Sequence, residues 1–255
     1  MKRLISAAIL IPLIAYVIIW SPQPVFLGVV VLLAALCFYE YCGIAAGHGV
    51  EINPWLGMVP GLAFLFVEWH HALVTTLIAL VLMTAAMRKD DLTRCLPFAS
   101  ALLLGLAYVF GCWRSAIDLR AASPWWLLFA VTINWVGDSA AYYVGVAFGR
   151  HKMAPVVSPK KSWEGAAASA AASTLYGTLL LHFLIPTVPL WQGLVFSVVA
   201  NAAGQIGDLA ESAMKRGAGI KDSGNLLPGH GGWLDRVDST LFSMPATQLL
   251  LALFY

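Results

Sequence analysis

The chain has 255 residues, of which 60% are hydrophobic and only 11% are charged, with a formal net charge of +2. Its mean hydropathy is +0.80. Soluble domains are typically about 25% charged, so this composition excludes an ordinary water-soluble protein. The apolar residues come in blocks of about 17–23, enough to cross a bilayer core, and the alternating pattern of a membrane β-barrel is absent. We expect an all-α polytopic membrane protein that forms one integral membrane domain over residues 1–255.

The hydropathy pattern predicts about nine transmembrane helices. The first apolar run follows Lys2 and Arg3 and ends without a small-x-small cleavage site, so it is expected to be a retained helix and not a signal peptide. The third and fourth helices meet with almost no loop and form the weakest hairpin of the series. The expected spans are 4–20, 24–46, 55–68, 70–87, 96–112, 125–147, 165–185, 189–210 and 239–255.

The distribution of Lys and Arg predicts the orientation of these helices. With the N-terminus in the cytoplasm, 13 of the 15 Lys and Arg residues fall on the inner side, and Arg114 and Arg120 fall outside. This bias follows the positive-inside rule and supports nine spans with the C-terminus outside. Two large loops, 148–164 and 211–238, are then cytoplasmic, as expected for a protein of a bacterial inner membrane.

An unusually charged stretch runs from Asp208 to Asp238. It holds nine of the chain's 28 charged residues (15 Lys and Arg, 13 Asp and Glu) within 31 positions. Carboxylates stand at both ends, and cations and glycines fill the middle. Carboxylates hold Mg²⁺, basic side chains neutralise phosphate oxygens, and glycines let backbone N–H groups come close. The pattern therefore predicts a metal-bridged phosphate site.

Polar side chains also form two helical stripes within the apolar runs. Intramembrane charges are costly and indicate function, although Asp138 could instead pair with a nearby cation and lock the bundle. Because both helices run from outside to inside, we expect the two stripes to reach one pocket in the inner leaflet. The stripes are Asn134, Asp138 and Tyr142 on the sixth helix, and Asn201, Gln205, Asp208, Ser212 and Lys215 on the eighth.

A second basic segment precedes the seventh helix. Ser162 is expected to cap that helix, with Glu164 in its first turn. Lys160 and Lys161 would then lie beside a helix N-terminus, which favours anions. The alternative is that these two lysines only contact lipid headgroups.

Two single residues complete the candidates. Glu40 lies between two tyrosines near the inner end of the second helix and is either part of the site or an interfacial residue. His230 lies between glycines inside the charged stretch and is expected to serve the site.

The charged stretch resembles the signature of the phosphatidate cytidylyltransferases, the CDP-diacylglycerol synthases. Segments 158–165 and 138–142 also resemble motifs of this family, whereas residues 1–120 resemble it only in hydropathy. Trp233 departs from the aliphatic residue usual there. The matching pattern is Ser212-x-Met214-Lys215-Arg216-x4-Lys221-Asp222-x-Gly224-x2-Leu227-Pro228-x-His230-Gly231-Gly232-x2-Asp235-Arg236-Val237-Asp238.

This resemblance implies that residues from about 121 to 255 form the catalytic half and that CTP and phosphatidate react to give CDP-diacylglycerol and pyrophosphate with Mg²⁺. It also suggests a homodimer. Asp208 and Asp235 are expected to hold Mg²⁺, with Asp138 and Asp238 as second candidates for this ion or a second one. The expected catalytic residues are Asp208, Asp235, Lys215, Arg236 and His230. The expected substrate-binding residues are Ser158, Lys160, Lys161, Ser162, Arg216, Lys221, Asp222, Gly231, Gly232, Asn134 and Tyr142.

Three other functions are weighed against this one. A CDP-alcohol phosphotransferase needs D-x-x-D-G-x-x-A-R, but the chain continues Ser239-Thr240 after Asp235-Arg236-Val237-Asp238. A transporter would have charges at mid-membrane or on both sides, whereas the charges of this chain cluster on the expected inner side. No pattern in the sequence indicates nucleic-acid binding. A related cytidylyltransferase that uses another lipid phosphate is the main alternative.

Overall fold

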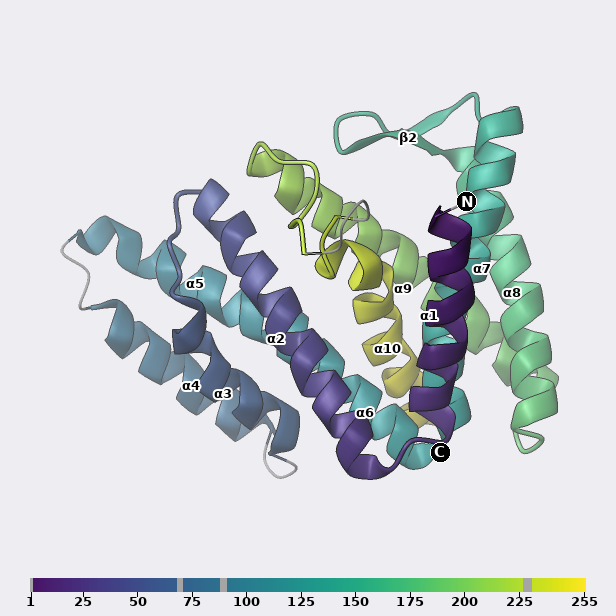
Figure 1. Cartoon of the computed structure of the whole chain (residues 1–255), viewed down its shortest axis with the longest axis horizontal. Coiled ribbons are helices and arrows are strands. Elements are labelled where there is room, and N and C mark those ends of the chain that lie inside the picture. Colours follow the sequence, from purple (N-terminus) through teal and green to yellow (C-terminus); the bar gives the residue numbers. More distant parts are fainter. Residues whose placement is uncertain (1, 68–70, 88–90, 227–230) are drawn as a thin grey trace.

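The computed structural model describes residues 2–67, 71–87, 91–226 and 231–255 and is almost entirely helical (Figure 1). The first half contains α1 (Lys2–Ile19), α2 (Gln23–Gly47), α3 (Pro54–Phe66), α4 (His71–Ala86), η1 (Leu92–Arg94), α5 (Cys95–Gly105), the π-helical turn η2 (Leu106–Gly111) and α6 (Cys112–Ala122). The second half contains α7 (Pro124–Phe148), β1 (Lys152–Ala154), β2 (Ser158–Ser162), α8 (Trp163–Leu184), α9 (Leu190–Gly217) and α10 (Leu234–Phe254).

The all-α membrane class is confirmed at the level of composition and helix length. Within the described ranges, five helical segments are long and apolar enough to cross a membrane. They are Gln23–Gly47, Leu92–Ala122, Trp163–Leu184, Leu190–Gly217 and Leu234–Phe254. The predicted count of nine spans goes beyond this number. The junction expected between the third and fourth helices falls on residues 68–70, outside the described residues.

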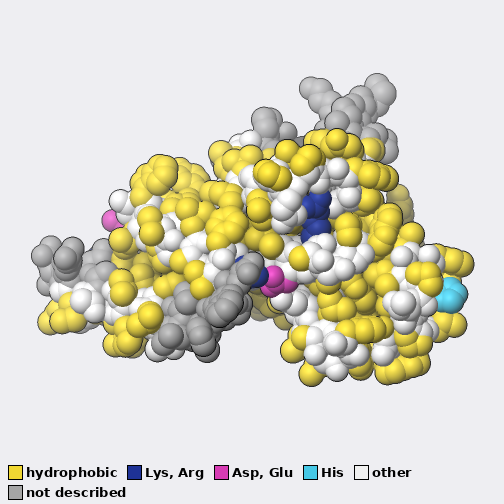
Figure 2. Space-filling model, turned by 90° about the horizontal axis from the view of Figure 1, so that it is seen from below, with side chains coloured by type: hydrophobic (Ala, Val, Ile, Leu, Met, Phe, Trp, Pro, Cys, Tyr) yellow, Lys and Arg dark blue, Asp and Glu magenta, His cyan; other side chains and the backbone are white. Residues whose placement is uncertain are grey.

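The helices form two groups joined at α10. α8 packs along α7 and α9, and α9 packs along α10, while α2 to α6 gather on the other side (Figure 1). α10 contacts α2, α6, α7 and α9 and is therefore central. The β1–β2 hairpin and the start of α1 lie at the upper end in Figure 1, and the C-terminus lies at the lower end. Figure 2 shows the lower face, where hydrophobic side chains predominate and charged ones are few.

Small and polar residues allow α7, α8 and α9 to pack closely. A Cβ at Gly137 would overlap the hydroxyls of Ser169 and Ser173, so the helices approach only because this residue is glycine. Asn201 Nδ2 donates to both hydroxyls at 3.0 Å. Asn134 Nδ2 donates to Ser243 Oγ at 2.8 Å and to a carbonyl of its own helix. Buried amides and hydroxyls thus satisfy one another inside the bundle, as an apolar environment requires.

Three predicted helix boundaries are wrong, and one predicted loop contains a hairpin. The fifth predicted helix does not end at 112, because α6 continues to Ala122 with Arg114 and Asp118 paired one turn apart at 2.7 Å. The predicted loop 148–164 contains the β1–β2 hairpin. The predicted loop 211–238 is shorter, because α9 continues through the Glu211–Lys215 ion pair to Gly217 and α10 begins at Leu234.

Candidate functional site

One half of the candidate site is built on the last three turns of α9. Asp208, Glu211 and Lys215 lie at spacings of three and four, so they share one face of the helix. Glu211 is fully buried and pairs with Lys215. The sequence analysis did not select Glu211 as a site residue, although its position four residues before Lys215 is the spacing of a helical ion pair.

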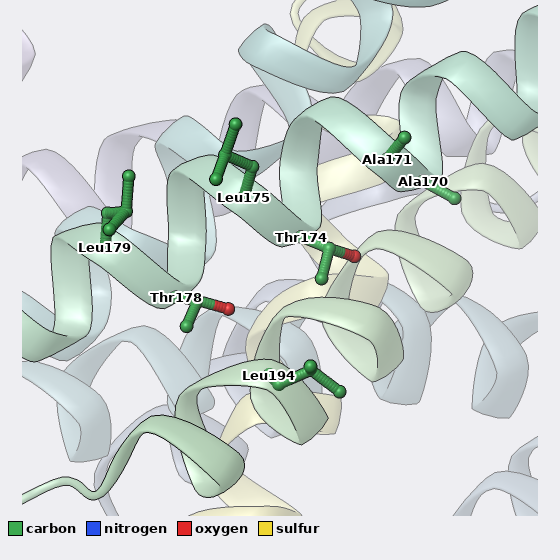
Figure 3. A pocket seen from close by; sticks show the side chains of 7 residues that line it. All are labelled: Ala170, Ala171, Thr174, Leu175, Thr178, Leu179 and Leu194. Atoms are coloured by element: carbon green, nitrogen blue, oxygen red, sulfur yellow. The ribbon is translucent and has the colours of Figure 1, made fainter.

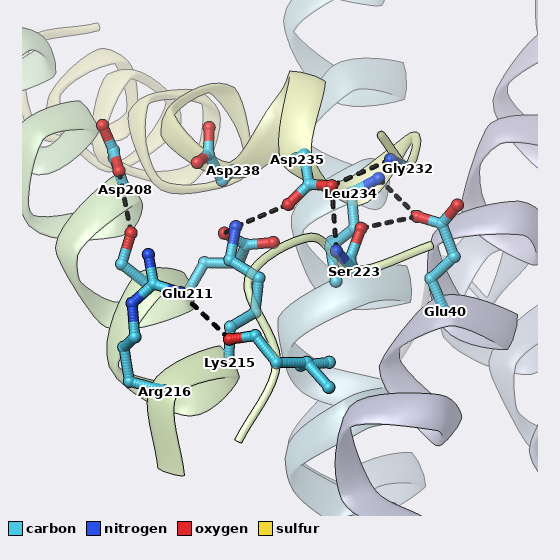
Figure 4. A network of polar contacts seen from close by, with 12 residues as sticks. Glu40, Asp208, Glu211, Lys215, Arg216, Ser223, Gly232, Leu234, Asp235 and Asp238 are labelled. Carbon is cyan, nitrogen blue, oxygen red and sulfur yellow. Dashed lines mark hydrogen bonds and ion pairs between the residues drawn. The ribbon is translucent and has the colours of Figure 1, made fainter. Parts of the chain in front are cut away.

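Lys215 joins α9 to α10. Its Nζ lies 2.5 Å from Asp235 Oδ1, and both side chains are only 9% exposed (Figure 4). The ammonium group therefore balances two carboxylates, those of Glu211 and Asp235, in a nearly buried position. Such a pair is stable only while each charge keeps its partner.

Asp235 also closes the loop before α10. Its Oδ2 accepts hydrogen bonds from the backbone N–H of Ser223 at 2.9 Å and of Gly232 at 2.8 Å (Figure 4). Gly231 has a φ of +77°, a left-handed conformation that glycine adopts without strain. Both oxygens of Asp235 thus accept hydrogen bonds from the chain itself, and its expected role as a Mg²⁺ ligand stays a prediction.

The other half of the site comes from the β1–β2 hairpin. Lys161, on β2, places its Nζ 2.7 Å from Asp208 Oδ2, and the two side chains are 28% and 27% exposed. The predicted cap is confirmed, since Ser162 Oγ accepts from the backbone N–H of Gly165 at 3.2 Å. Glu164 then accepts from the backbone N–H groups of Arg150 and His151, which ties the hairpin to α8. The lysine is therefore held at the site by a cap and a loop anchor.

Asp138 and Asp238 extend the cluster on either side. Asp138 interacts electrostatically with Asp208 and Lys161. Asp238 interacts electrostatically with Asp208, and also with Glu211 and Lys215. Asp208 on α9 therefore lies within electrostatic range of charges from α7, β2 and α10, and the expected convergence on one substrate pocket stays a prediction.

The other residues predicted for the site differ in their burial. Asn134 is buried, and its amide hydrogens are used inside the bundle, so the structure does not place it within reach of a substrate. Arg216 bonds to the carbonyl of Ile220 at 3.0 Å. Tyr142, Lys160, Lys221, Asp222 and Arg236 are exposed, and Ser158 is half-buried on β2. His230 lies outside the described residues.

The donor set suits a hard divalent cation. In the described part of the chain, Lys161 and Lys215 contact three carboxylates, those of Asp208, Glu211 and Asp235, and the carboxylates of Asp138 and Asp238 lie within electrostatic range of Asp208. Carboxylate oxygens are the ligands that Mg²⁺ prefers. The same residues show no ready-made group of three metal ligands.

An apolar pocket of about 510 Å³ lies elsewhere, between α8 and α9 (Figure 3). Its lining consists of Ala, Thr and Leu side chains, among them Thr174, Thr178 and Leu194. Such a lining can take hydrocarbon but cannot neutralise phosphate, so the polar site is distinct from it.

Comparisons with known proteins agree with the resemblance. Proteins named phosphatidate cytidylyltransferase are similar to the chain in Staphylococcus saprophyticus (38% identity over 153 residues), Staphylococcus epidermidis (39% over 153) and Bacillus subtilis (39% over 154). These alignments cover 59–60% of this chain. They span only 57–59% of the length of those relatives. The model of the cytidylyltransferase family matches residues 1–254. Because that match includes nearly every residue, the protein belongs to the cytidylyltransferase family.

Proposed function

We propose that the protein transfers a cytidylyl group from CTP to phosphatidate, forming CDP-diacylglycerol and pyrophosphate. It rests on membership of the cytidylyltransferase family and on similarity to phosphatidate cytidylyltransferases that the chain matches over about three fifths of their length. A phosphate oxygen of phosphatidate attacks the α-phosphorus of CTP, and the bond from that phosphorus to the bridging oxygen breaks. The leaving group is pyrophosphate.

The single observation that carries this proposal is the meeting of two lysine–carboxylate clusters at one end of an apolar bundle. The Lys161–Asp208 pair and the Glu211–Lys215–Asp235 group share α9, on which Asp208 and Glu211 lie three residues apart. A lipid phosphate and a soluble nucleotide can meet only where a membrane protein leaves the bilayer. Basic groups at this membrane boundary can neutralise the negative charge of both reactants.

The residues divide by exposure. Lys161 is partly exposed and close to solvent-facing Lys160, so these two are assigned to phosphate oxygens of CTP or phosphatidate. Arg216, Lys221 and Arg236 are exposed and can neutralise further phosphate charge. Lys215, by contrast, is nearly buried and is assigned to holding Asp235 and the loop. The attacking group is already anionic, so the site needs no strong general base.

We further propose that Asp208 is the central Mg²⁺ ligand, with Asp138 and Asp238 beside it. Asp208 interacts with both of these carboxylates and is partly exposed. Asp235 is a further candidate ligand, because its Oδ1 accepts one described hydrogen bond, from Lys215, and keeps a second lone pair. Bound Mg²⁺ would supply charge neutralisation at the triphosphate and stabilise the displaced pyrophosphate.

We place this end of the bundle on the cytoplasmic side of a bacterial inner membrane, where CTP is available. The start of α1, the β1–β2 hairpin and the end of α9 lie together at one end, which is what the Lys and Arg distribution predicts (Figure 1). A transporter fits less well, because the paired charges lie at one end of the bundle. The buried amides of Asn134 and Asn201 are bonded to serine hydroxyls inside it and do not line a path.

The substrate test is pyrophosphate release by the purified protein with a panel of lipid phosphates and nucleotides. We expect release only when phosphatidate and CTP are both present. Equal or faster release with another lipid phosphate would identify the related enzyme instead, and release without any lipid would reject a lipid acceptor.

A further inference from the structure

Glu40, near the inner end of α2, is a buried carboxylate that contacts the charged stretch from outside it. Its side chain is only 3% exposed. Oε2 accepts from Ser223 Oγ at 3.0 Å and from the backbone N–H of Leu234 at 2.8 Å. Oε1 accepts from the backbone N–H of Trp233 at 3.1 Å. Burial rules out the alternative of an exposed interfacial residue.

These contacts complete the beginning of α10. The first N–H groups of a helix have no partner within the helix, and a capping side chain normally accepts from one of them. Trp233 is the N-cap residue of α10 and makes no side-chain cap. Glu40 supplies the missing acceptor from a different helix. Its negative charge also suits the positive end of the dipole of α10.

Two glycines of the charged stretch are explained by the same carboxylate. A Cβ at Gly232 would overlap Ser223 Oγ and Glu40 Oε2. A Cβ at Gly224 would lie 2.7 Å from Glu40 Oε1, closer than real Cβ atoms come. The loop therefore packs directly on the Glu40 side chain, and no larger residue fits at either position without moving it.

We propose that Glu40 is a positioning residue for the cytidylyl transfer. It holds the loop and the first turn of α10 so that Asp235 stays beside Lys215. Ser223 is the shared element, because its hydroxyl donates to Glu40 and its backbone N–H donates to Asp235. The two carboxylates thus fix the loop from opposite sides, one from the first half of the chain and one from α10 itself. Glu40 makes no contact with the substrate in this assignment.

The test compares Glu40→Gln with Asp118→Asn. Asp118 pairs with Arg114 on α6 and with Gln248 on α10, and α6 lies toward the lower end of the bundle in Figure 1, away from the β1–β2 hairpin. In Glu40→Gln, an amide group replaces one of the two accepting oxygens. Its N–H then faces one of the groups that donate to Glu40 and cannot accept a hydrogen bond from it. We expect hydrogen exchange in peptides covering residues 231–237 to become at least ~10-fold faster, the loss of one charge-assisted bond. We expect kcat/KM to fall at least ~10-fold, mainly in kcat.

Asp118→Asn should lower the melting temperature but leave both the exchange of these peptides and kcat/KM close to the wild type. If Glu40→Gln yields no folded protein, Ser223→Ala removes one of the three donors and should accelerate exchange of the same peptides by a smaller factor. Wild-type exchange at residues 231–237 in either folded variant would overturn the proposal, as would equal acceleration in Asp118→Asn.

The kinetic part rests on the proposed function, and the two failures are separable. A wild-type protein that forms no product from CTP and phosphatidate rejects that function. The exchange measurement still decides whether Glu40 holds the loop and the start of α10.

Discussion

Replacing Lys215 with Met tests the energetics of the buried charges most sharply. The side chain keeps its length, but the ammonium group that balances Glu211 and Asp235 is lost. Removing one partner of a buried ion pair costs about 3–5 kcal/mol, because a charge is left without compensation. Lys215 and Asp235 keep 9% exposure, so the lower value of about 3 kcal/mol is the better expectation.

That free energy translates into a measurable change in melting temperature. For chains of this size, 1 kcal/mol shifts Tm by about 2–4 °C, so Lys215→Met should melt about 6–12 °C lower in detergent, followed by tryptophan fluorescence. Glu211→Gln keeps the Lys215–Asp235 contact and should shift Tm by less. The double variant with Lys215→Met and Glu211→Gln has one fewer carboxylate without a counter-charge. Its loss of unfolding free energy should therefore be about 0.5–3 kcal/mol smaller than the sum of the two single losses. A Tm for Lys215→Met within 2 °C of the wild type (roughly 1 kcal/mol or less), or strict additivity, would refute the reasoning.

Three further predictions concern ligands and orientation. Asp208→Asn keeps the size of the side chain but removes its charge, so the Mg²⁺ concentration giving half-maximal rate should rise sharply; an unchanged titration contradicts the metal assignment. Lys161→Gln should lower kcat/KM at least ~10-fold, the loss of one charge-assisted contact, and more than Lys160→Gln, because Lys161 also reaches Asp208; unchanged kinetics in both variants would point to headgroup contact. In a cysteine-free background, an impermeant thiol reagent should label Thr187→Cys but not Asn225→Cys in intact cells, and the reverse pattern inverts the topology.

The part of the site that the sequence predicted correctly depends on local spacing. Asp208 and Lys215 share a helix face because seven residues make two turns, and the structure brings them into one network through Asp238 and Glu211. The cap at Ser162 follows from residue type and is also observed. Local rules therefore suffice where the contact lies within one helix or its first turn.

Helical spacing did not indicate which residues of each stripe are buried inside the bundle. Asn134 and Asn201 follow the helical pattern of the charged residues. However, both are buried, and their amide groups donate hydrogen bonds to serine hydroxyls on neighbouring helices. A stripe indicates a face and does not indicate how far along the helix solvent reaches. The buried amides are therefore packing residues, and only the ends of the stripes enter the charged cluster.

Contacts between distant segments could not be predicted from one sequence. Glu40 and Ser223 are 183 residues apart, and no periodic pattern links them. Lys161 and Asp208 were expected to converge only because topology placed both at the same side. The engagement of Asp235 by Lys215, Ser223 and Gly232 likewise depends on the fold of the loop, which glycine content alone does not determine.

The most direct measurement of the central claim is the stoichiometry of the two products. The purified protein is incubated with CTP labelled in the cytidine moiety, phosphatidate and Mg²⁺, and lipid-bound label and pyrophosphate are both quantified. The account predicts one CDP-diacylglycerol for each pyrophosphate, and neither product when phosphatidate is omitted. Label that never enters the lipid fraction, or pyrophosphate released without lipid product, would contradict it.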